Sequence, residues 1–137
     1  MPHLIIEYSR NLEDRIVIGD LARKVHEAAL ASGVFEVGAV RTRTEPRDVY
    51  VIADGHPENA FVALTIRIAS GRSAETRKRL GQSIFDAACS HLAGVYETTP
   101  IGISLEVQEI DPTASFKKNN LHAVVKQRAG KAEVGKV

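Results

Sequence analysis

The sequence contains little sulfur and few aromatic side chains. Its 137 residues include one cysteine, one methionine, four phenylalanines, three tyrosines and no tryptophan. The single Cys89 excludes an intrachain disulfide and favours a reducing compartment. No basic stretch is interleaved with aromatic residues, as it is in proteins that stack the bases of single-stranded nucleic acids. These absences argue against a disulfide-stabilised secreted domain and against a nucleic-acid-binding module.

The chain also has no excess of charge and no long apolar run. Its 18 basic residues nearly balance 17 acidic ones, which leaves a net charge of +1 and no overall field for nucleic acid or an anionic membrane. The apolar runs are far shorter than the roughly 18 residues of a membrane helix, and the start MPHLIIEYS has no basic leader. The composition, 44% hydrophobic, predicts one cytoplasmic globular domain.

Sequence motifs for metals and cofactors are absent as well. None of the five histidines pairs with another at the spacing of helical metal ligands. No P-loop, dinucleotide-binding glycine motif or nucleophile elbow occurs. Cys89 lies beside Ala88 in an apolar stretch, which indicates a buried and unreactive thiol. We expect neither a metal nor a cofactor.

Hydrophobic spacing predicts one strand–helix–strand unit twice. In the first half, HLIIEY is a strand, DLARKVHEAALASG is a helix with Asp20 as its N-cap, and VGAVRTRT is a second strand. In the second half, FVALTIRIA is a strand, a helix follows Ser73 as its N-cap, and IGISLEVQEI is the next strand. A shift of about 60 residues brings the two halves into the same parity, so that Leu4 meets Leu64.

This internal repeat predicts an α+β fold of two consecutive βαβ units, with a four-stranded sheet and two helices packed on one face. The same shift makes Arg41 and Ile101 equivalent positions in two strands. The predicted segments are a first unit at about 2–45, a loop or hairpin at 45–60, a second unit at about 60–110, a C-terminal arm at 111–126 and a mobile tail at 127–137.

Two helices on one face leave the other face of the sheet uncovered. That face includes Ile5, Ala63 and Thr65, together with one of the two alternating sets of residues in IGISLEV. Because a partly apolar, uncovered face implies a partner, we expect identical subunits in a closed ring to bury it. The alternative is a monomer whose own loops cover the sheet.

Pro2 follows the initiator methionine and precedes the first strand. Proline is tolerated at the first position of a strand, where no ladder hydrogen bond is lost, so one reading of Pro2 is a strand edge only. If Met1 is removed, the Pro2 nitrogen instead becomes a terminal secondary amine. Such an amine acts as a base at neutral pH only if burial or nearby cations lower its pKa.

Two arginine motifs provide candidate cations. Arg72 in SGRS lies between a strand and a helix, where backbone N–H groups and the helix dipole help to hold a carboxylate. Arg41 and Arg43 in RTR share one face of a strand. Taken singly, each is more often a solvated surface residue. Together with Pro2 they indicate cofactor-free proton transfer between carbons of a small keto acid, whose carboxylates and developing enolate charge the arginines stabilise.

Three stretches carry a family resemblance. MPHLIIEYS, ADGHPENAFVALTIRIASGRS and FKKNNLHAVVK resemble the 5-carboxymethyl-2-hydroxymuconate isomerases, which belong to the tautomerase superfamily with 4-oxalocrotonate tautomerase and macrophage migration inhibitory factor. The resemblance covers about residues 1–126. It implies a homotrimer of βαβ-repeat subunits, with active sites at the subunit boundaries.

The resemblance also implies an activity and its residues. It implies conversion of 5-carboxymethyl-2-hydroxymuconate, a small anionic polycarboxylate, to its keto tautomer in homoprotocatechuate breakdown, a branch of aromatic catabolism. Pro2 matches the general base, while Arg41 and Arg72 match the arginines that bind carboxylates and polarise the carbonyl end. Pocket or interface positions are matched by Arg43, Phe116 and Asn120.

Two alternatives remain open at this point. One is another enzyme of the tautomerase superfamily, acting on a different 2-hydroxydienoate or on a halo-acrylate. The other is a non-catalytic binding protein of the same fold, which a retained Met1 would favour because the Pro2 nitrogen would then be an amide. The residues from Gln127 onward extend beyond the resemblance and have no implied role.

Overall fold

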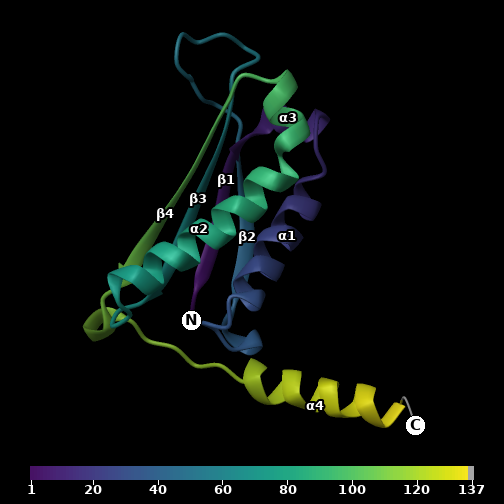
Figure 1. Ribbon diagram of the computed structural model, residues 1–137, viewed down its shortest axis with the longest axis vertical. Coiled ribbons are helices and arrows are strands. Elements are labelled where there is room, and N and C mark those ends of the chain that lie inside the picture. The colour runs from purple at the N-terminus through teal and green to yellow at the C-terminus, as the bar shows by residue number, and fades with distance from the viewer. Residues whose placement is uncertain (136–137) are drawn as a thin grey trace.

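One four-stranded sheet organises the fold in the computed structural model, which describes residues 1–135 and the side chains of residues 1–130. Its strands are β1 (His3–Ser9), β2 (Arg41–Arg47), β3 (Ala60–Ala69) and β4 (Ile101–Ile110), in the order β2-β1-β3-β4 (Figure 1). β1 pairs in parallel with β2, and β3 with β4, whereas β1 and β3 are antiparallel. The predicted pair of βαβ units is therefore confirmed, and the first strands of the two units lie side by side.

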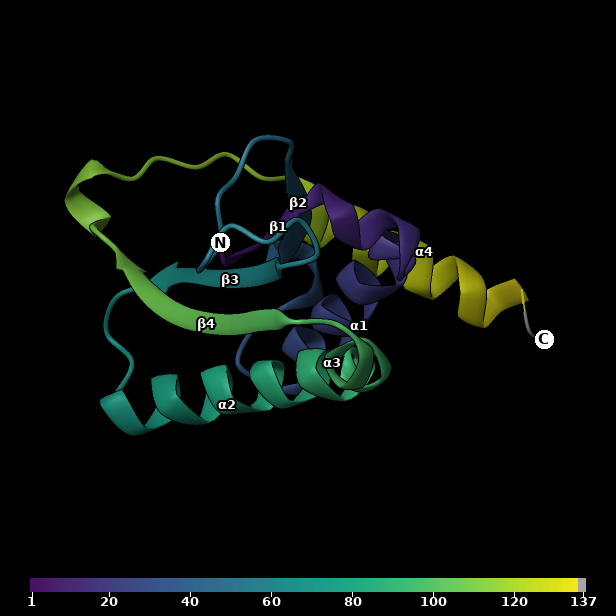
Figure 2. The same cartoon turned by 90° about the horizontal axis from the view of Figure 1, so that it is seen from above.

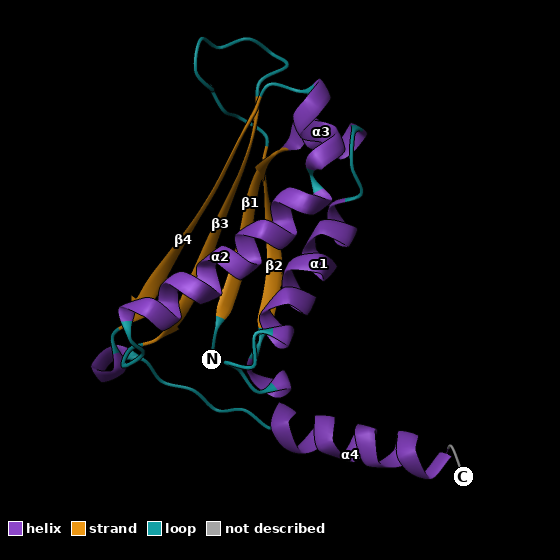
Figure 3. Cartoon of the chain, in the orientation of Figure 1, coloured by secondary structure: helices purple, strands orange, loops and turns teal. Residues whose placement is uncertain are grey.

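The helices cover one face of this sheet. α1 (Ile18–Ala31) and α2 (Ala74–His91), with the short α3 (Ala93–Thr98), lie together beneath it in Figure 2. Three 3-10 turns, η1 (Arg10–Asp14), η2 (Val37–Ala39) and η3 (Pro112–Ala114), join the elements. The last helix, α4 (Leu121–Gly135), projects away from the sheet (Figure 3). None of these helices is both long and apolar enough to span a membrane.

The core lies between the sheet and the helices α1 and α2. It consists of the residues that the hydrophobic spacing predicted. Leu4 and Ile6 of β1 and Ile66 of β3 have no exposed surface, and Leu64 is 1% exposed. The helices contribute one buried stripe each: Leu21, Val25 and Ala29 from α1, and Leu80, Ile84 and Ala88 from α2, continued by Leu92 and Val95. Burial of these alternating and helical stripes is the main driving force for the fold.

The structure corrects two element boundaries. The N-cap of α1 is Val17, and its side chain makes no cap hydrogen bond, while Asp20 lies in the first turn of the helix and not at the cap. Residues 37–39, predicted as part of a strand, form η2 because the C-terminal segment packs against them. A Cβ at Gly38 would lie 2.8 Å from the backbone nitrogen of His122. β2 consequently begins at Arg41, the equivalent of Ile101 at the start of β4, as the repeat predicts.

The connection between the two repeat units is a loop, one of the two forms predicted for it, although residues 45–47 of the predicted connection belong to β2. Residues 48–59 form a loop without strand pairing, and positive φ angles at Ala53 and Gly55 shape its turn. The predicted boundary at residue 126 between arm and tail falls inside α4. The predicted mobility of residues 127–137 stays a prediction, and residues 136–137 lie outside the described residues.

The uncovered face of the sheet carries the even-numbered set of β4. Leu105 and Val107 face α2, where they approach Gly81, so Gly102, Ser104 and Glu106 lie on the open side. Charged residues add to this face: Arg47 of β2 pairs with Glu7 at 2.6 Å and with Glu45 at 2.8 Å. The open face is therefore more polar than the sequence alone suggests.

Ser73 supplies a cap whose removal has a predictable cost. Its Oγ accepts a hydrogen bond from the Thr76 N–H at 3.1 Å, as its predicted N-cap role requires. Ser73→Ala should lower the free energy of unfolding by about 1 kcal/mol, because the Thr76 N–H loses its acceptor. Urea unfolding at fixed protein concentration measures this. Ser73→Asp should keep most of the stability, and Ser83→Ala on the exposed side of α2 is the control; equal stability of the two alanine variants would contradict the cap.

Candidate active site

Pro2 lies buried at the point where β1 enters the sheet. Its carbonyl oxygen accepts a hydrogen bond from the Arg41 N–H at 3.2 Å, which ties the start of β1 to the start of β2. The next residue, His3, is paired in register with Arg41 of β2 and with Arg67 of β3. The amino terminus therefore lies at one end of a central strand, and each neighbouring strand carries an arginine opposite His3.

Two cavities flank the amino terminus. The first, which we call the terminal cavity, has a volume of about 480 Å³ and is lined by Met1, Pro2, Val34, Phe35, Glu36, Ala39, Ala69, Arg72, Lys117, Asn119 and His122. The second, the side cavity, has a volume of about 190 Å³ and is lined by Met1, His3, Ala69, Ile110, Pro112, Ser115, Phe116 and Lys117. Met1, Ala69 and Lys117 belong to both, so the two cavities adjoin at the terminus.

The guanidinium of Arg72 is held at the wall of the terminal cavity. It lies 5.3 Å from the centroid of the Phe35 ring, a cation–π distance. Its two terminal nitrogens lie 3.4 Å and 3.5 Å from the carbonyl oxygens of Ala69 and Val34. These contacts orient the positive side chain without neutralising it, since no described carboxylate pairs with Arg72.

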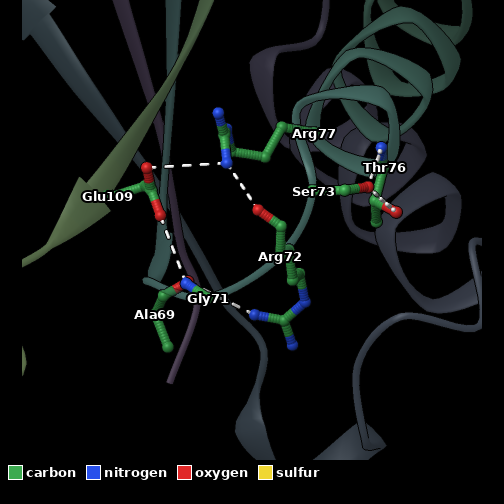
Figure 4. A network of polar contacts seen from close by, with 7 residues as sticks. All are labelled: Ala69, Gly71, Arg72, Ser73, Thr76, Arg77 and Glu109. Carbon is green, nitrogen blue, oxygen red and sulfur yellow. Dashed lines mark hydrogen bonds and ion pairs between the residues drawn. The ribbon is translucent and has the colours of Figure 1, made fainter.

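The backbone around Arg72 is clamped from two other elements (Figure 4). Arg77 of α2 donates to the Arg72 carbonyl oxygen at 2.5 Å and also forms an ion pair with Glu109 of β4 at 3.6 Å. The second oxygen of Glu109 accepts from the Gly71 N–H at 3.3 Å. Gly71 has a φ of +112°, a conformation that glycine tolerates best. Glu109 and Arg77 thus fix the short turn that presents Arg72.

The two arginines of RTR both lie outside the two cavities. The Arg41 side chain is half-buried near the amino terminus and donates to the Ala39 carbonyl oxygen at 2.9 Å, but it lines neither cavity. Arg43 is exposed, and its Nη1 lies 3.1 Å from Nδ1 of His3. Pro2 and Arg72 share a cavity, therefore, while Arg41 and Arg43 approach the terminus from the open face of the sheet.

Burial and positive charge together act on the groups that titrate here. Burial lowers the pKa of the Met1 amino group, and the charges of Lys117, Arg41 and Arg72 lower it further. Burial also lowers the pKa of His3, with Arg43, Arg67 and Arg41 acting in the same direction. A neutral amine is therefore favoured at this end of the sheet.

The acidic residues of the chain do not offset this charge. Glu36 is the one acidic residue among those that line the two cavities, and its carboxylate lies 3.0 Å from Nδ1 of His122. Several arginines elsewhere do form ion pairs, as Arg79 does with Glu75 at 3.1 Å. The site is suited to an anionic ligand that brings the missing carboxylates.

The C-terminal segment contributes residues that the sequence motifs did not identify. Lys117, Asn119 and His122 line the terminal cavity, and Asn119 donates to the Gly38 carbonyl oxygen at 3.2 Å. Asn120 is exposed and lines neither cavity, whereas Phe116, 93% exposed, borders the side cavity. The conspicuous FKKNN stretch was the available signal, but only the folded chain shows which of its residues reach the terminus.

Other candidate groups lie apart from this site. A cavity of about 550 Å³ between α2, α3 and β4 is lined by Cys89, Tyr96 and Ile103 and by no basic residue, which makes it unsuited to a carboxylate. Burial and the charge of Asp86 raise the pKa of the Cys89 thiol, so it is protonated at neutral pH. No cluster of three metal-ligating side chains occurs among the described residues.

Known proteins resemble this chain over most of its length. A sequence model described as 5-carboxymethyl-2-hydroxymuconate isomerase matches residues 2–125. The 5-carboxymethyl-2-hydroxymuconate Delta-isomerase of Escherichia coli is 36% identical over 126 residues, which are 92% of this chain and 100% of that protein.

Solved structures agree with this match. The crystal structure of a 5-carboxymethyl-2-hydroxymuconate isomerase from Deinococcus radiodurans R1 has a TM-score of 0.84 at 35% identity, covering 90% of this chain and 93% of its own. The crystal structure of native fused 4-OT has a TM-score of 0.63 at 14% identity, covering 90% and 98%, and at that identity it shares the fold alone. The two βαβ units and their sheet are thus an architecture already seen in solved structures.

Proposed function

This chain belongs to the 5-carboxymethyl-2-hydroxymuconate isomerase family, and we propose that it converts that dienol to its keto tautomer with the Pro2 amine as general base. As a member of the family it is an isomerase. The observation that carries the proposal is the partly buried amino terminus next to the buried Pro2, surrounded by arginines and a lysine that have no described carboxylate partners. The reaction needs no cofactor. We place it in the catabolism of aromatic acids, as the resemblance implies, and in the cytoplasm, as the composition predicts.

The proposed step moves one proton. The O–H bond at C2 of the dienol breaks, the C2 carbonyl forms, the double bonds shift, and a C–H bond forms at C5, which gives the conjugated enone. A base that accepts and returns this proton must be neutral at the start. Removal of Met1 would turn the Pro2 nitrogen into a secondary amine, and the burial and cations that lower the pKa of the amino terminus would keep that amine neutral near pH 7.

The arginines have separate proposed roles. Arg72, fixed by the clamp of Arg77 and Glu109, binds a substrate carboxylate and stabilises charge on the developing enolate oxygen. Arg41, half-buried beside Pro2, acts on the terminus through its charge and contributes to substrate binding. Arg43 is a binding residue on the open face, where its neighbour is His3.

Blocking the terminal amine tests the base directly. An extra serine inserted between Met1 and Pro2 leaves the Pro2 nitrogen in an amide, so kcat on 5-carboxymethyl-2-hydroxymuconate should fall by about a hundred- to ten-thousand-fold. Pro2→Ala keeps a terminal amine, although a primary one, and should retain part of the activity. In the native protein kcat/KM should rise with pH through one ionisation, because only the neutral amine accepts a proton.

The outcome depends on the fold being retained. Circular dichroism and the melting temperature should show the inserted variant to be native-like. If it turns over substrate as fast as the unmodified protein, the amine is not the base and Pro2 is only a strand edge. The same holds if intact mass shows Met1 retained in fully active protein.

Arg72 should be required for substrate binding and turnover. Arg72→Ala should lower kcat/KM about ten- to a hundred-fold, the loss expected for one charge-assisted contact. Arg72→Lys keeps the charge but loses the planar fork, so it should recover only part of the activity. Arg79→Ala, which removes an arginine already paired with Glu75 on the surface of α2, is the matched control. Equal kcat/KM for the two alanine variants would remove Arg72 from the site.

A homotrimer is the assembly that we propose. The open face of the sheet and the outer edge of β4 have no cover from the described residues, and a closed ring of three subunits would bury both. Light scattering at micromolar concentration should give three times the chain mass of 14.9 kDa. A mass equal to that of one chain would contradict the trimer.

A further inference from the structure

Lys117 is the one cation that lines both cavities at the amino terminus. It reaches the site on the C-terminal segment between η3 and α4, which crosses the end of the sheet where β1 begins (Figure 1). Burial lowers the pKa of the Met1 amino group and the charge of Lys117 lowers it further, so the two groups lie close together. Lys117 forms no ion pair with a described carboxylate. An ammonium held beside another amine, without a counter-ion, is costly unless an anion joins it.

The side cavity is suited to such an anion. No acidic residue lines it, and its lining includes the apolar side chains of Ile110 and Phe116 together with the polar terminus. Burial lowers the pKa of His3 at its wall, and the charges of Arg43 and Arg67 lower it further, so the nearby charges are positive. Its volume of about 190 Å³ fits one end of an extended substrate, while the adjoining terminal cavity of about 480 Å³ takes the rest.

The proposed substrate is asymmetric in a way that matches two adjoining cavities. Its C1 carboxylate lies next to the C2 hydroxyl, whereas C5 bears both the C6 carboxylate and the carboxymethyl branch, a unit that resembles succinate. The proton is added at C5, so the base must lie against this end. A cation that lines both cavities beside the amino terminus is then within reach of the two carboxylates on C5.

We propose that Lys117 binds the carboxylates at the C5 end of the substrate in the side cavity, while Arg72 holds the C1 end in the terminal cavity. This inference rests on the proposed function and adds a second anchor and a direction to it. The substrate lies across the amino terminus, with C5 beside the Pro2 nitrogen. Lys117 thereby selects dienols that carry acidic groups at C5 over those that do not.

Two substrates and three variants test this selection. Lys117→Met should lower kcat/KM for 5-carboxymethyl-2-hydroxymuconate about ten- to a hundred-fold, chiefly through KM, because one charge-assisted contact is lost. On 2-hydroxypenta-2,4-dienoate, which lacks both C5-end carboxylates, the same variant should lose far less. Lys117→Arg should restore most of the binding. Lys118→Met is the matched control, since Lys118 is the adjacent lysine and lines neither cavity.

Competitive inhibitors test the same role of Lys117 without the need for the short substrate to turn over. Competitive inhibition by 2-propylsuccinate, which imitates the C5 end, should weaken at least tenfold in Lys117→Met. Inhibition by 2-oxopentanoate, which imitates the C1 end, should weaken in Arg72→Ala and not in Lys117→Met. Melting temperatures of the lysine variants should match that of the unmodified protein.

Each contrary result has a distinct meaning. If Lys117→Met and Lys118→Met behave alike toward substrates and inhibitors, Lys117 is not an anchor. If Lys117→Met loses activity equally on both substrates and keeps its affinity for 2-propylsuccinate, Lys117 acts on the terminal amine alone and the carboxylate site is wrong. If the unmodified protein does not turn over 5-carboxymethyl-2-hydroxymuconate while 2-propylsuccinate still binds through Lys117, the proposed function fails and the anion site stands.

Discussion

The candidate site gathers uncompensated positive charge around a partly buried amino terminus. Arg41, Arg72 and Lys117 act on one amino group, and no described carboxylate pairs with any of them. Such an arrangement destabilises the folded chain, because like charges repel and a partly buried amine loses hydration. We propose that the same two effects make the amine a base near neutral pH, and that the unpaired cations bind an anionic substrate.

The fold concentrates this charge by bringing together distant parts of the chain. Two βαβ units place β1 between β2 and β3, so the first residues of the chain lie inside the sheet and not at its edge. The turn after β3 then presents Arg72, with Glu109 of β4 and Arg77 of α2 holding its backbone. Finally the C-terminal segment returns across the same end and adds Lys117. Arg77 and Glu109 form these hydrogen bonds with backbone groups of the turn, and the Arg72 guanidinium has no described carboxylate partner.

The sequence predicts the parts of this arrangement that follow from periodicity. Alternation in the strands and the stripes on the helices are consequences of burial, and they identified the core residues and the repeat. The N-cap of α1 was misplaced because Asp20 is a good capping residue, whereas the structure uses Val17, which has no capping side chain. The start of β2 was predicted four residues too early, because residues 37–39 form η2, which packs against His122, a contact that local propensity does not encode. Lys117 and Asn119 were missed for the same reason, since they join the site only through tertiary folding.

We propose that the terminal nitrogen is a neutral amine at physiological pH. The chain has five prolines, so protein labelled with [15N]proline gives few signals, and one of them should be an amine and not an amide. A 15N titration should show that signal shifting with a pKa below the value of about 8 that is usual for an α-amino group. It would contradict the account if all the proline nitrogens had amide shifts that do not titrate, or if the amine titrated at or above that value.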